Sequence, residues 1–174
     1  MLDSLLSLDA SVLQWFNTLP HPASLTFIMN AATTSAVGSA IWFGLALVVA
    51  RQGDFESAFR VVLSLIVTAV VVSGILKPSI NRDRPALMAV GERVVAIQSD
   101  SPSFPSGHAA GAAAGAYSLA RVWLTRAPLI WSLAIVIAVS RVYLGAHYPL
   151  DVLAGFFVGL SCVIVVTGDS GQYR

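Results

Sequence analysis

The chain has 174 residues, of which 56% are hydrophobic and 11% are charged, and its mean hydropathy is +0.78. An ordinary soluble domain carries about 25% charged residues, so this composition argues against a soluble protein and indicates one integral membrane domain over residues 1–174. The net charge of +1 comes without a basic run or basic face, so nucleic acid is not expected as a partner.

Residues 1–20 are predicted to form an amphipathic helix in the membrane interface. Its apolar residues fall roughly on one helical face: Leu5, Leu8, Val12, Trp15 and Phe16. Asp9 and Asn17 lie elsewhere on the helix. Such a pattern is typical of helices that lie in the plane of the membrane surface. The positively charged region of a signal peptide is missing, so a cleavable signal peptide is not expected.

Five membrane-spanning segments are predicted after this helix. They are expected within residues 25–50, and at residues 61–76, 106–124, 129–144 and 149–167. The first is interrupted by polar residues, so part of it is expected to lie in the interface. The second is shorter than the roughly 20 residues that a span needs, and Arg60 and Lys77 are expected to lengthen it by snorkelling. The predicted fold class is an all-α membrane bundle of five to six transmembrane helices.

Glycines recur every four residues in two of these segments. Gly107, Gly111 and Gly115 lie in the third span, and Gly155 and Gly159 lie in the fifth. Stripes of small residues let helix backbones approach one another closely. We therefore interpret both stripes as packing surfaces without a chemical role.

Three polar clusters lie in an otherwise apolar region, within residues 77–85, 105–108 and 140–151. They are Lys77 with Arg84-Pro85, Pro105-Ser106-Gly107-His108, and Ser140-Arg141 with His147 and Asp151. Because successive spans alternate in direction, the connections that hold these clusters open on the same side of the membrane. Ionisable groups are costly near hydrocarbon and often mark function, so we expect the clusters to form one site.

The residue types in these clusters suit the binding of a phosphate group. Lys77, Arg84 and Arg141 supply positive charge, and arginine can bind phosphate oxygens with two parallel hydrogen bonds. Ser106 and Gly107 stand at a predicted helix N-terminus, where free N–H groups favour an anion.

The histidines and the carboxylate suit covalent catalysis. Asp151 follows His147 by four residues, so the carboxylate can face the imidazole at the start of a helix. This arrangement fixes one ring nitrogen and leaves the other free to attack, as in a catalytic triad. His108 can then act as the general acid toward the leaving oxygen.

Together the three clusters form the pattern Lys77-x(6)-Arg84-Pro85, Pro105-Ser106-Gly107-His108 and Ser140-Arg141-x(5)-His147-x(3)-Asp151. This pattern resembles the signature of the type-2 phosphatidic acid phosphatase superfamily. It is similar in particular to the membrane lipid phosphatase or undecaprenyl-diphosphatase-like branch. The resemblance implies that His147 forms a phosphohistidine, that Asp151 orients it, and that His108 acts as acid and then as base. It implies phosphate binding by Lys77, Arg84, Ser106, Gly107 and Arg141. It also implies a helical core that needs no metal or other cofactor.

The expected function is therefore hydrolysis of a terminal phosphate from a lipid phosphate or diphosphate, such as polyprenyl diphosphate, phosphatidate or phosphatidylglycerol phosphate. Two alternatives stay open: a phosphatase or phosphotransferase of soluble phosphate esters, and a non-catalytic lipid-phosphate carrier. Taken singly, Arg141 and Asp151 could instead form a structural ion pair. Arg82, Asp83 and Arg93 are interpreted as solvated loop charges, with contact to a lipid head group as an alternative for Arg82 or Arg93.

Counting cations predicts the orientation of the chain in the plasma or inner membrane. One side is expected to carry Arg51, Arg60, Arg121, Arg126 and Arg174. Apart from residues assigned to the site, the other side carries only Arg82 and Arg93. The positive-inside rule then places the five arginines in the cytoplasm and the site on the extracytoplasmic side.

Overall fold

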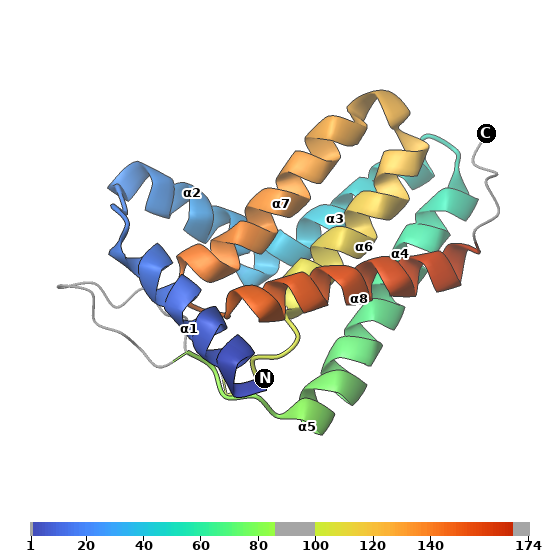
Figure 1. Cartoon of the computed structure of the whole chain (residues 1–174). Helices are drawn as coiled ribbons and strands as arrows, with labels where there is room; N and C mark the ends of the chain where they lie inside the picture. The colour runs from blue at the N-terminus through green and yellow to red at the C-terminus, as the bar shows by residue number, and fades with distance from the viewer. Residues whose placement is uncertain (1, 86–99, 169–174) are drawn as a thin grey trace.

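A computed structural model describes residues 2–85 and 100–168, and all regular structure in these two ranges is helical (Figure 1). The helices are α1 (Leu2–Thr18), α2 (Ala23–Thr33), α3 (Ser35–Arg51), α4 (Phe55–Ala69), the π-helix η1 (Val70–Leu76), α5 (Lys77–Ile80), α6 (Gly107–Val122), the 3₁₀-helix η2 (Leu124–Arg126), α7 (Ala127–Tyr143) and α8 (Pro149–Thr167). The predicted all-α class is confirmed for these ranges.

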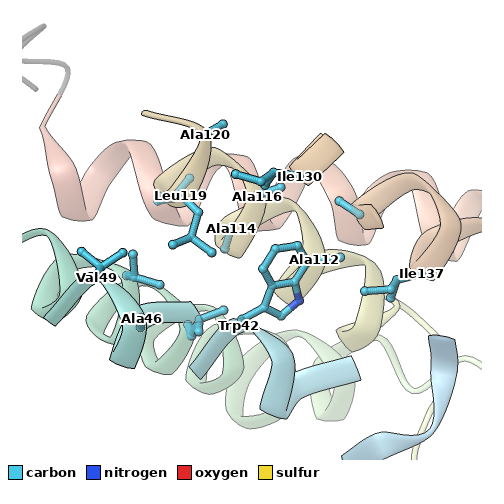
Figure 2. Packing of buried hydrophobic residues seen from close by; sticks show 14 of the residues in the cluster. Trp42, Ala46, Val49, Ala112, Ala114, Ala116, Leu119, Ala120, Ile130 and Ile137 are labelled. Atoms are coloured by element: carbon cyan, nitrogen blue, oxygen red, sulfur yellow. The ribbon is translucent and has the colours of Figure 1, made fainter. Parts of the chain in front are cut away.

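Helix α6 lies at the centre of the bundle and contacts α3, α4, α7 and α8. Its sequence is rich in alanine, and Ala112, Ala114 and Ala116 are buried against Trp42 of α3 and neighbouring apolar side chains (Figure 2). Small side chains allow a central helix to be surrounded on several faces at once, because neighbouring backbones can come close. The third predicted span therefore forms the core of the molecule.

The predicted glycine stripe of α8 packs closely, whereas on α6 only Gly115 does so and Gly111 has open space around it. A Cβ atom on Gly155 or Gly159 of α8 would lie 2.3 Å from the Ser106 carbonyl oxygen and 2.1 Å from the Ala110 carbonyl oxygen, respectively. On α6, a Cβ atom on Gly115 would lie 2.6 Å from the Trp42 ring. Helices α6 and α8 are thus in backbone contact at the end of α6 that carries the Ser106-Gly107-His108 motif.

Several predicted spans differ from the observed helices. Within the described residues, three helical stretches are long and apolar enough to cross a membrane: Phe55–Ile80, Leu124–Tyr143 and Pro149–Thr167. The second span is thus not short, because α4, η1 and α5 run on without a break and include both Arg60 and Lys77. The first span consists of two helices, α2 and α3, which meet at Thr34. The total of five to six transmembrane helices stays a prediction.

Helix α1 confirms that the N-terminal segment is helical, and its predicted apolar face points away from the bundle, while its place in the membrane interface stays a prediction. Leu8 and Trp15 of the predicted apolar face are 60% and 58% exposed, whereas Asp9 is 3% exposed and Leu13 is 5% exposed. Leu13 packs with apolar residues of α6, α7 and α8. In a membrane protein the outer surface is apolar and ionisable residues face the bundle, so the carboxylate of α1 points inward.

Candidate active site

A cavity of about 420 Å³ lies beside α6, and six of the eight predicted site residues line it. These six are Lys77, Arg84, Gly107, His108, Arg141 and His147. They come from α5, the loop after it, α6, α7 and the connection between α7 and α8. The other two predicted residues, Ser106 and Asp151, are fully buried next to the cavity.

Two of the cations are fixed by the segment that precedes α6. Lys77 Nζ donates to the Pro102 carbonyl oxygen at 2.7 Å and to Ser101 Oγ at 3.2 Å. Arg84 Nε donates to the Ser101 carbonyl oxygen at 2.8 Å. Of the lining residues that the structure describes, none is a carboxylate. The cavity therefore carries the positive charge of three cations, which favours an anionic ligand.

Thr33, at the end of α2, contacts the third cation and the first histidine. Its hydroxyl accepts a hydrogen bond from Arg141, and its backbone is hydrogen-bonded to His108. Within residues 2–85 and 100–168, Arg141 Nε and His108 Nε2 are buried without a hydrogen-bond partner. A buried polar atom without a partner destabilises the fold by about 1–3 kcal/mol. A ligand that hydrogen-bonds to these two atoms would remove that penalty, so both are candidates for ligand binding.

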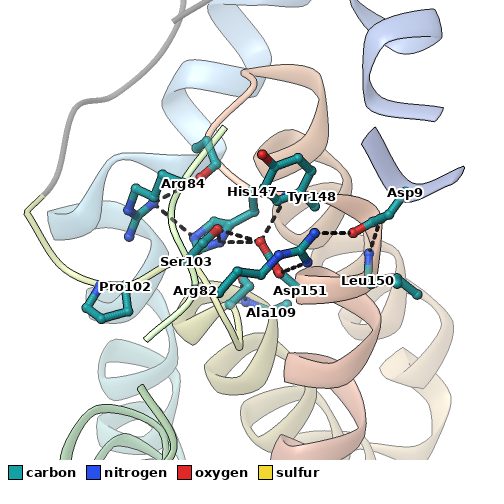
Figure 3. Close-up of polar contacts among 12 residues, drawn as sticks. Asp9, Arg82, Arg84, Pro102, Ser103, Ala109, His147, Tyr148, Leu150 and Asp151 are labelled. Carbon is teal, nitrogen blue, oxygen red and sulfur yellow. Dashed lines mark hydrogen bonds and ion pairs between the residues drawn. The ribbon is translucent and has the colours of Figure 1, made fainter. Parts of the chain in front are cut away.

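The protonation state of His147 follows from its neighbours (Figure 3). Arg84 Nη1 lies 3.3 Å from His147 Nε2, and a guanidinium can only donate, so Nε2 carries a lone pair. Ser103 Oγ donates to Asp151 Oδ2 at 2.5 Å and lies 3.3 Å from His147 Nδ1. The single hydroxyl proton of Ser103 points at the carboxylate, so the Ser103 oxygen can only accept from the ring. Nδ1 therefore carries the ring proton and donates it to Ser103 Oγ.

His147 and Asp151 are therefore close, but the Ser103 hydroxyl connects them. Nδ1 lies 3.6 Å from Asp151 Oδ2, which is longer than a hydrogen bond. The predicted pairing of the imidazole with the carboxylate is present at ion-pair distance, and a relay through the Ser103 hydroxyl also links the two groups. The relay has the same effect on the ring, because it fixes the proton on Nδ1 and leaves Nε2 free.

Burial lowers the pKa of His147 to about 4. The neighbouring Arg84 and Arg141 act in the same direction, and the Asp151 carboxylate acts against them. The imidazole is therefore neutral at neutral pH, as a nucleophile requires.

Ser106 and Asp151 belong to the framework under the cavity. The Ser106 hydroxyl accepts a hydrogen bond from the Ala109 N–H at 3.5 Å and caps α6, while its own N–H donates to the Asp151 carbonyl oxygen at 2.9 Å. The Asp151 carboxylate also accepts the Tyr148 N–H at 3.0 Å. These contacts join the N-termini of α6 and α8, which carry His108 and Asp151.

Sequence reasoning missed Ser103 and misread Arg82. Arg82 is not a solvated loop charge, because its guanidinium forms ion pairs with Asp151 at 2.6 Å and Asp9 at 2.8 Å. The alternative of an Arg141–Asp151 ion pair is wrong, since Arg82 is the cation that pairs with Asp151. Ser103 lies only three residues before Ser106, which is the one sequence signal that could have indicated it. Arg93 lies outside the described residues.

Comparisons with known proteins agree with the sequence pattern. Residues 57–172 match the model of the PAP2 superfamily. The chain is 48% identical over 61 residues to an undecaprenyl-diphosphatase of Sulfolobus acidocaldarius, covering 33% of this chain and 28% of that protein. It is 31% identical over 109 residues to phosphatidylglycerophosphatase B of Bacillus subtilis, covering 56% of this chain and 51% of that protein. The matched region thus spans about half the length of these curated relatives, or less.

The fold is also similar to that of a solved structure. The crystal structure of a transmembrane PAP2-type phosphatidylglycerolphosphate phosphatase from Bacillus subtilis matches with a TM-score of 0.77 and 25% identity, covering 98% of this chain and 88% of that chain. The family model covers more than half of the chain and includes all three polar clusters. The chain is an integral membrane protein that belongs to the PAP2 superfamily.

Proposed function

We propose that the protein is a membrane lipid phosphatase that releases a terminal phosphate from a lipid phosphate or diphosphate. The observation that carries this proposal is the composition of the cavity, which combines three cations and two histidines with apolar side chains of α3 and α4. A lipid phosphate has the same two parts, an anionic head group and apolar chains. Names of relatives support it, since they describe enzymes that act on undecaprenyl diphosphate and on phosphatidylglycerol phosphate.

The reaction follows from the arrangement of the two histidines. Lys77, Arg84 and Arg141 bind the phosphate oxygens. His147 Nε2 then attacks phosphorus, forming the N–P bond as the bond to the leaving oxygen breaks. His108 donates a proton to that oxygen.

Hydrolysis of the phosphohistidine completes the cycle. His108, now neutral, takes a proton from a water molecule whose oxygen attacks phosphorus. The N–P bond breaks, inorganic phosphate leaves, and both histidines return to their first state. During attack the His147 ring gains positive charge, which Asp151 stabilises through Ser103.

We propose that lipid chains reach the site between α3 and α4. The apolar wall of the cavity includes Phe43 of α3 and Ile66 of α4, which are 44% and 50% exposed. In a bilayer these exposed apolar side chains face lipid, so a chain can move sideways between them while its head group stays near the cations.

Two further polar atoms in this wall favour a diphosphate. Trp42 and Thr68 line the cavity, and in the described part of the chain neither Trp42 Nε1 nor Thr68 Oγ1 has a hydrogen-bond partner. A diphosphate carries a second phosphate beyond the leaving oxygen, and the indole N–H and the hydroxyl are both donors. We therefore infer that a polyprenyl diphosphate is the preferred substrate.

The test is phosphate release by the purified protein from polyprenyl diphosphate, phosphatidate, phosphatidylglycerol phosphate and glycerol phosphate, with His147→Ala as the control. We expect turnover of the lipids, fastest for the diphosphate, and inhibition by vanadate, which mimics the pentacoordinate transition state. Release from glycerol phosphate alone would support the soluble-ester alternative. No release from any substrate by folded protein would support the non-catalytic carrier.

We further propose that the site faces the extracytoplasmic side of the membrane. Because Arg82 is paired with Asp9 and Asp151, it weighs less in the count of cations, which favours the side with five arginines as the cytoplasmic one. Single cysteines at Asp100 and Thr125, in a Cys162→Ala background, can be labelled with an impermeant maleimide on intact cells. We expect labelling at position 100 and none at position 125, and the reverse pattern would invert the orientation.

A further inference from the structure

Arg82 lies between two buried carboxylates from opposite ends of the chain (Figure 3). Its Nη1 donates to Asp151 Oδ1 at 2.6 Å and its Nη2 donates to Asp9 Oδ2 at 2.8 Å. The Asp9 and Asp151 side chains are 1% and 0% exposed. The guanidinium also stacks on the Tyr148 ring, 4.0 Å from the ring centroid. Arg82 is thus held in one orientation.

Asp9 also contacts the helix that carries Asp151. Its Oδ1 accepts the Leu150 N–H at 2.9 Å, in the first turn of α8, where backbone N–H groups have no partner inside the helix. Leu150 is adjacent to Asp151 in the chain. Asp9 of α1 therefore binds both the residue next to Asp151 and the arginine that holds the Asp151 side chain.

These contacts determine which way the Asp151 carboxylate faces. Arg82 occupies Oδ1, while Ser103 and the Tyr148 N–H occupy Oδ2. With both oxygens engaged, the carboxylate cannot rotate, and Oδ2 stays on the side of Ser103 and His147. Loss of Arg82 or of its anchor would free Oδ1 and let the carboxylate turn.

The charges of the three groups also matter. Arg82 is shared by two carboxylates, so the cluster of Asp9, Arg82 and Asp151 has a net charge of −1. This negative charge lies behind the His147 ring, which gains positive charge when it attacks phosphorus. Without Asp9, Arg82 would neutralise Asp151 alone, and the ring would be stabilised less.

We propose that Asp9 and Arg82 are positioning residues for the reaction, which hold Asp151 so that it orients His147 through Ser103. The N-terminal helix α1 is then part of the catalytic apparatus, although it adds no side chain to the cavity. This proposal rests on the proposed function of His147 as the nucleophile.

The main test compares Asp9→Asn and Asp9→Ala with wild type in detergent, measuring kcat and KM on whichever lipid the wild type hydrolyses. Small displacements of catalytic groups can cost about 100-fold in rate, so we expect kcat to fall by about 10- to 100-fold. KM and competitive inhibition by inorganic phosphate should be unchanged, because Lys77, Arg84 and Arg141 are not altered. Asp3→Asn, which removes an exposed charge from the same helix, should leave kcat unchanged.

A second measurement separates positioning from general stabilisation of the fold. If Asp9 acts through Asp151, then Asp9→Asn in an Asp151→Asn background should lower kcat by less than about two-fold, since coupled residues give non-additive effects. Arg82→Lys should behave like Asp9→Ala, because an ammonium group cannot bridge both carboxylates in the same geometry.

The outcomes are distinct from those that test the function itself. A wild type without phosphatase activity would refute the proposed function. An active wild type whose Asp9 variants keep kcat, lose kcat additively with Asp151→Asn, or fail to fold in both forms would overturn the positioning role, because a structural role or none would then suffice.

Discussion

The two sides of the His147 ring differ in how their polar atoms are satisfied. On the cavity side, Arg141 Nε and His108 Nε2 have no hydrogen-bond partner within the described residues. On the other side, both oxygens of Asp9 and both oxygens of Asp151 accept hydrogen bonds. One side is built to receive an anion, and the other is complete without a ligand. A single imidazole thus lies between a binding surface and a rigid support.

Removing the imidazole should have the largest effect, because both sides act through it. His147→Ala is expected to abolish turnover, and His108→Ala is expected to reduce it nearly as far, since His108 is the residue that protonates the leaving oxygen. Phosphate release by the purified variants measures both effects. Near-normal activity of His147→Ala would show that the nucleophile is misassigned.

Removing the negative charge of Asp151 should have the second-largest effect on turnover. Asp151→Asn is expected to lower kcat by about 10³- to 10⁴-fold, as for the carboxylate of a catalytic triad, while the protein stays folded. The amide can no longer accept the Ser103 proton in the same way, so the proton on Nδ1 is no longer fixed. Steady-state kinetics with a thermal unfolding control measures this effect, and a loss of less than ten-fold would contradict the relay.

Removing the Ser103 hydroxyl from the relay should lower kcat by less than the loss of the Asp151 charge. Ser103→Ala removes the hydroxyl that joins Nδ1 to the carboxylate, and one hydrogen bond to a charged group contributes about 1.5–3 kcal/mol. We expect kcat to fall by about 10- to 100-fold with KM unchanged. Ser103→Thr keeps the hydroxyl and should retain more activity, so equal losses in the two variants would argue against a relay.

The pH dependence of stability tests the burial of His147. Its pKa is about 4 in the folded protein and about 6.5 when unfolded, so the unfolded state binds more protons between these values. The protein should therefore lose up to about 3 kcal/mol of stability as the pH falls from about 6.5 to about 4. Thermal unfolding of wild type and His147→Ala should diverge across this window, and parallel curves would mean that the imidazole is not desolvated.

The smallest effect is expected at the apolar end of the cavity. Thr68→Val keeps the shape of the side chain and removes one donor, which contributes about 0.5–1.5 kcal/mol. We expect KM for a polyprenyl diphosphate to rise by about two- to ten-fold and KM for phosphatidate to stay the same. An equal change for both substrates would mean that Thr68 does not contact the second phosphate.

The cavity side could be predicted from the sequence, and the support could not. Lys77, Arg84, His108, Arg141 and His147 lie at the ends of apolar segments, and alternation of the spans is enough to bring them together. Arg82 and Arg84 are only two residues apart in one polar turn, and nothing in the sequence says which of them faces the carboxylate. Only the packing of that turn against α1 and α8 decides it.

Asp9 was missed for a different physical reason. The apolar residues of α1 were expected to lie in the membrane interface, and its polar side, with Asp9, was given no partner in the bundle. In a bilayer those residues face lipid, and the side with Asp9 and Leu13 contacts the bundle. The break at Thr34 and the continuous helix from Phe55 to Ile80 also depend on tertiary packing, which the pattern of apolar residues does not record.

The contact between Gly155 and the Ser106 carbonyl oxygen has a consequence for how the protein responds to its surroundings. The spacing between the two motifs on α6 and α8 is set by main-chain atoms, which cannot be compressed further. Lateral pressure and bilayer composition should therefore leave the distance between the proton donor and the nucleophile unchanged. Lipid environment can then influence the rate only by changing how substrate enters and product departs.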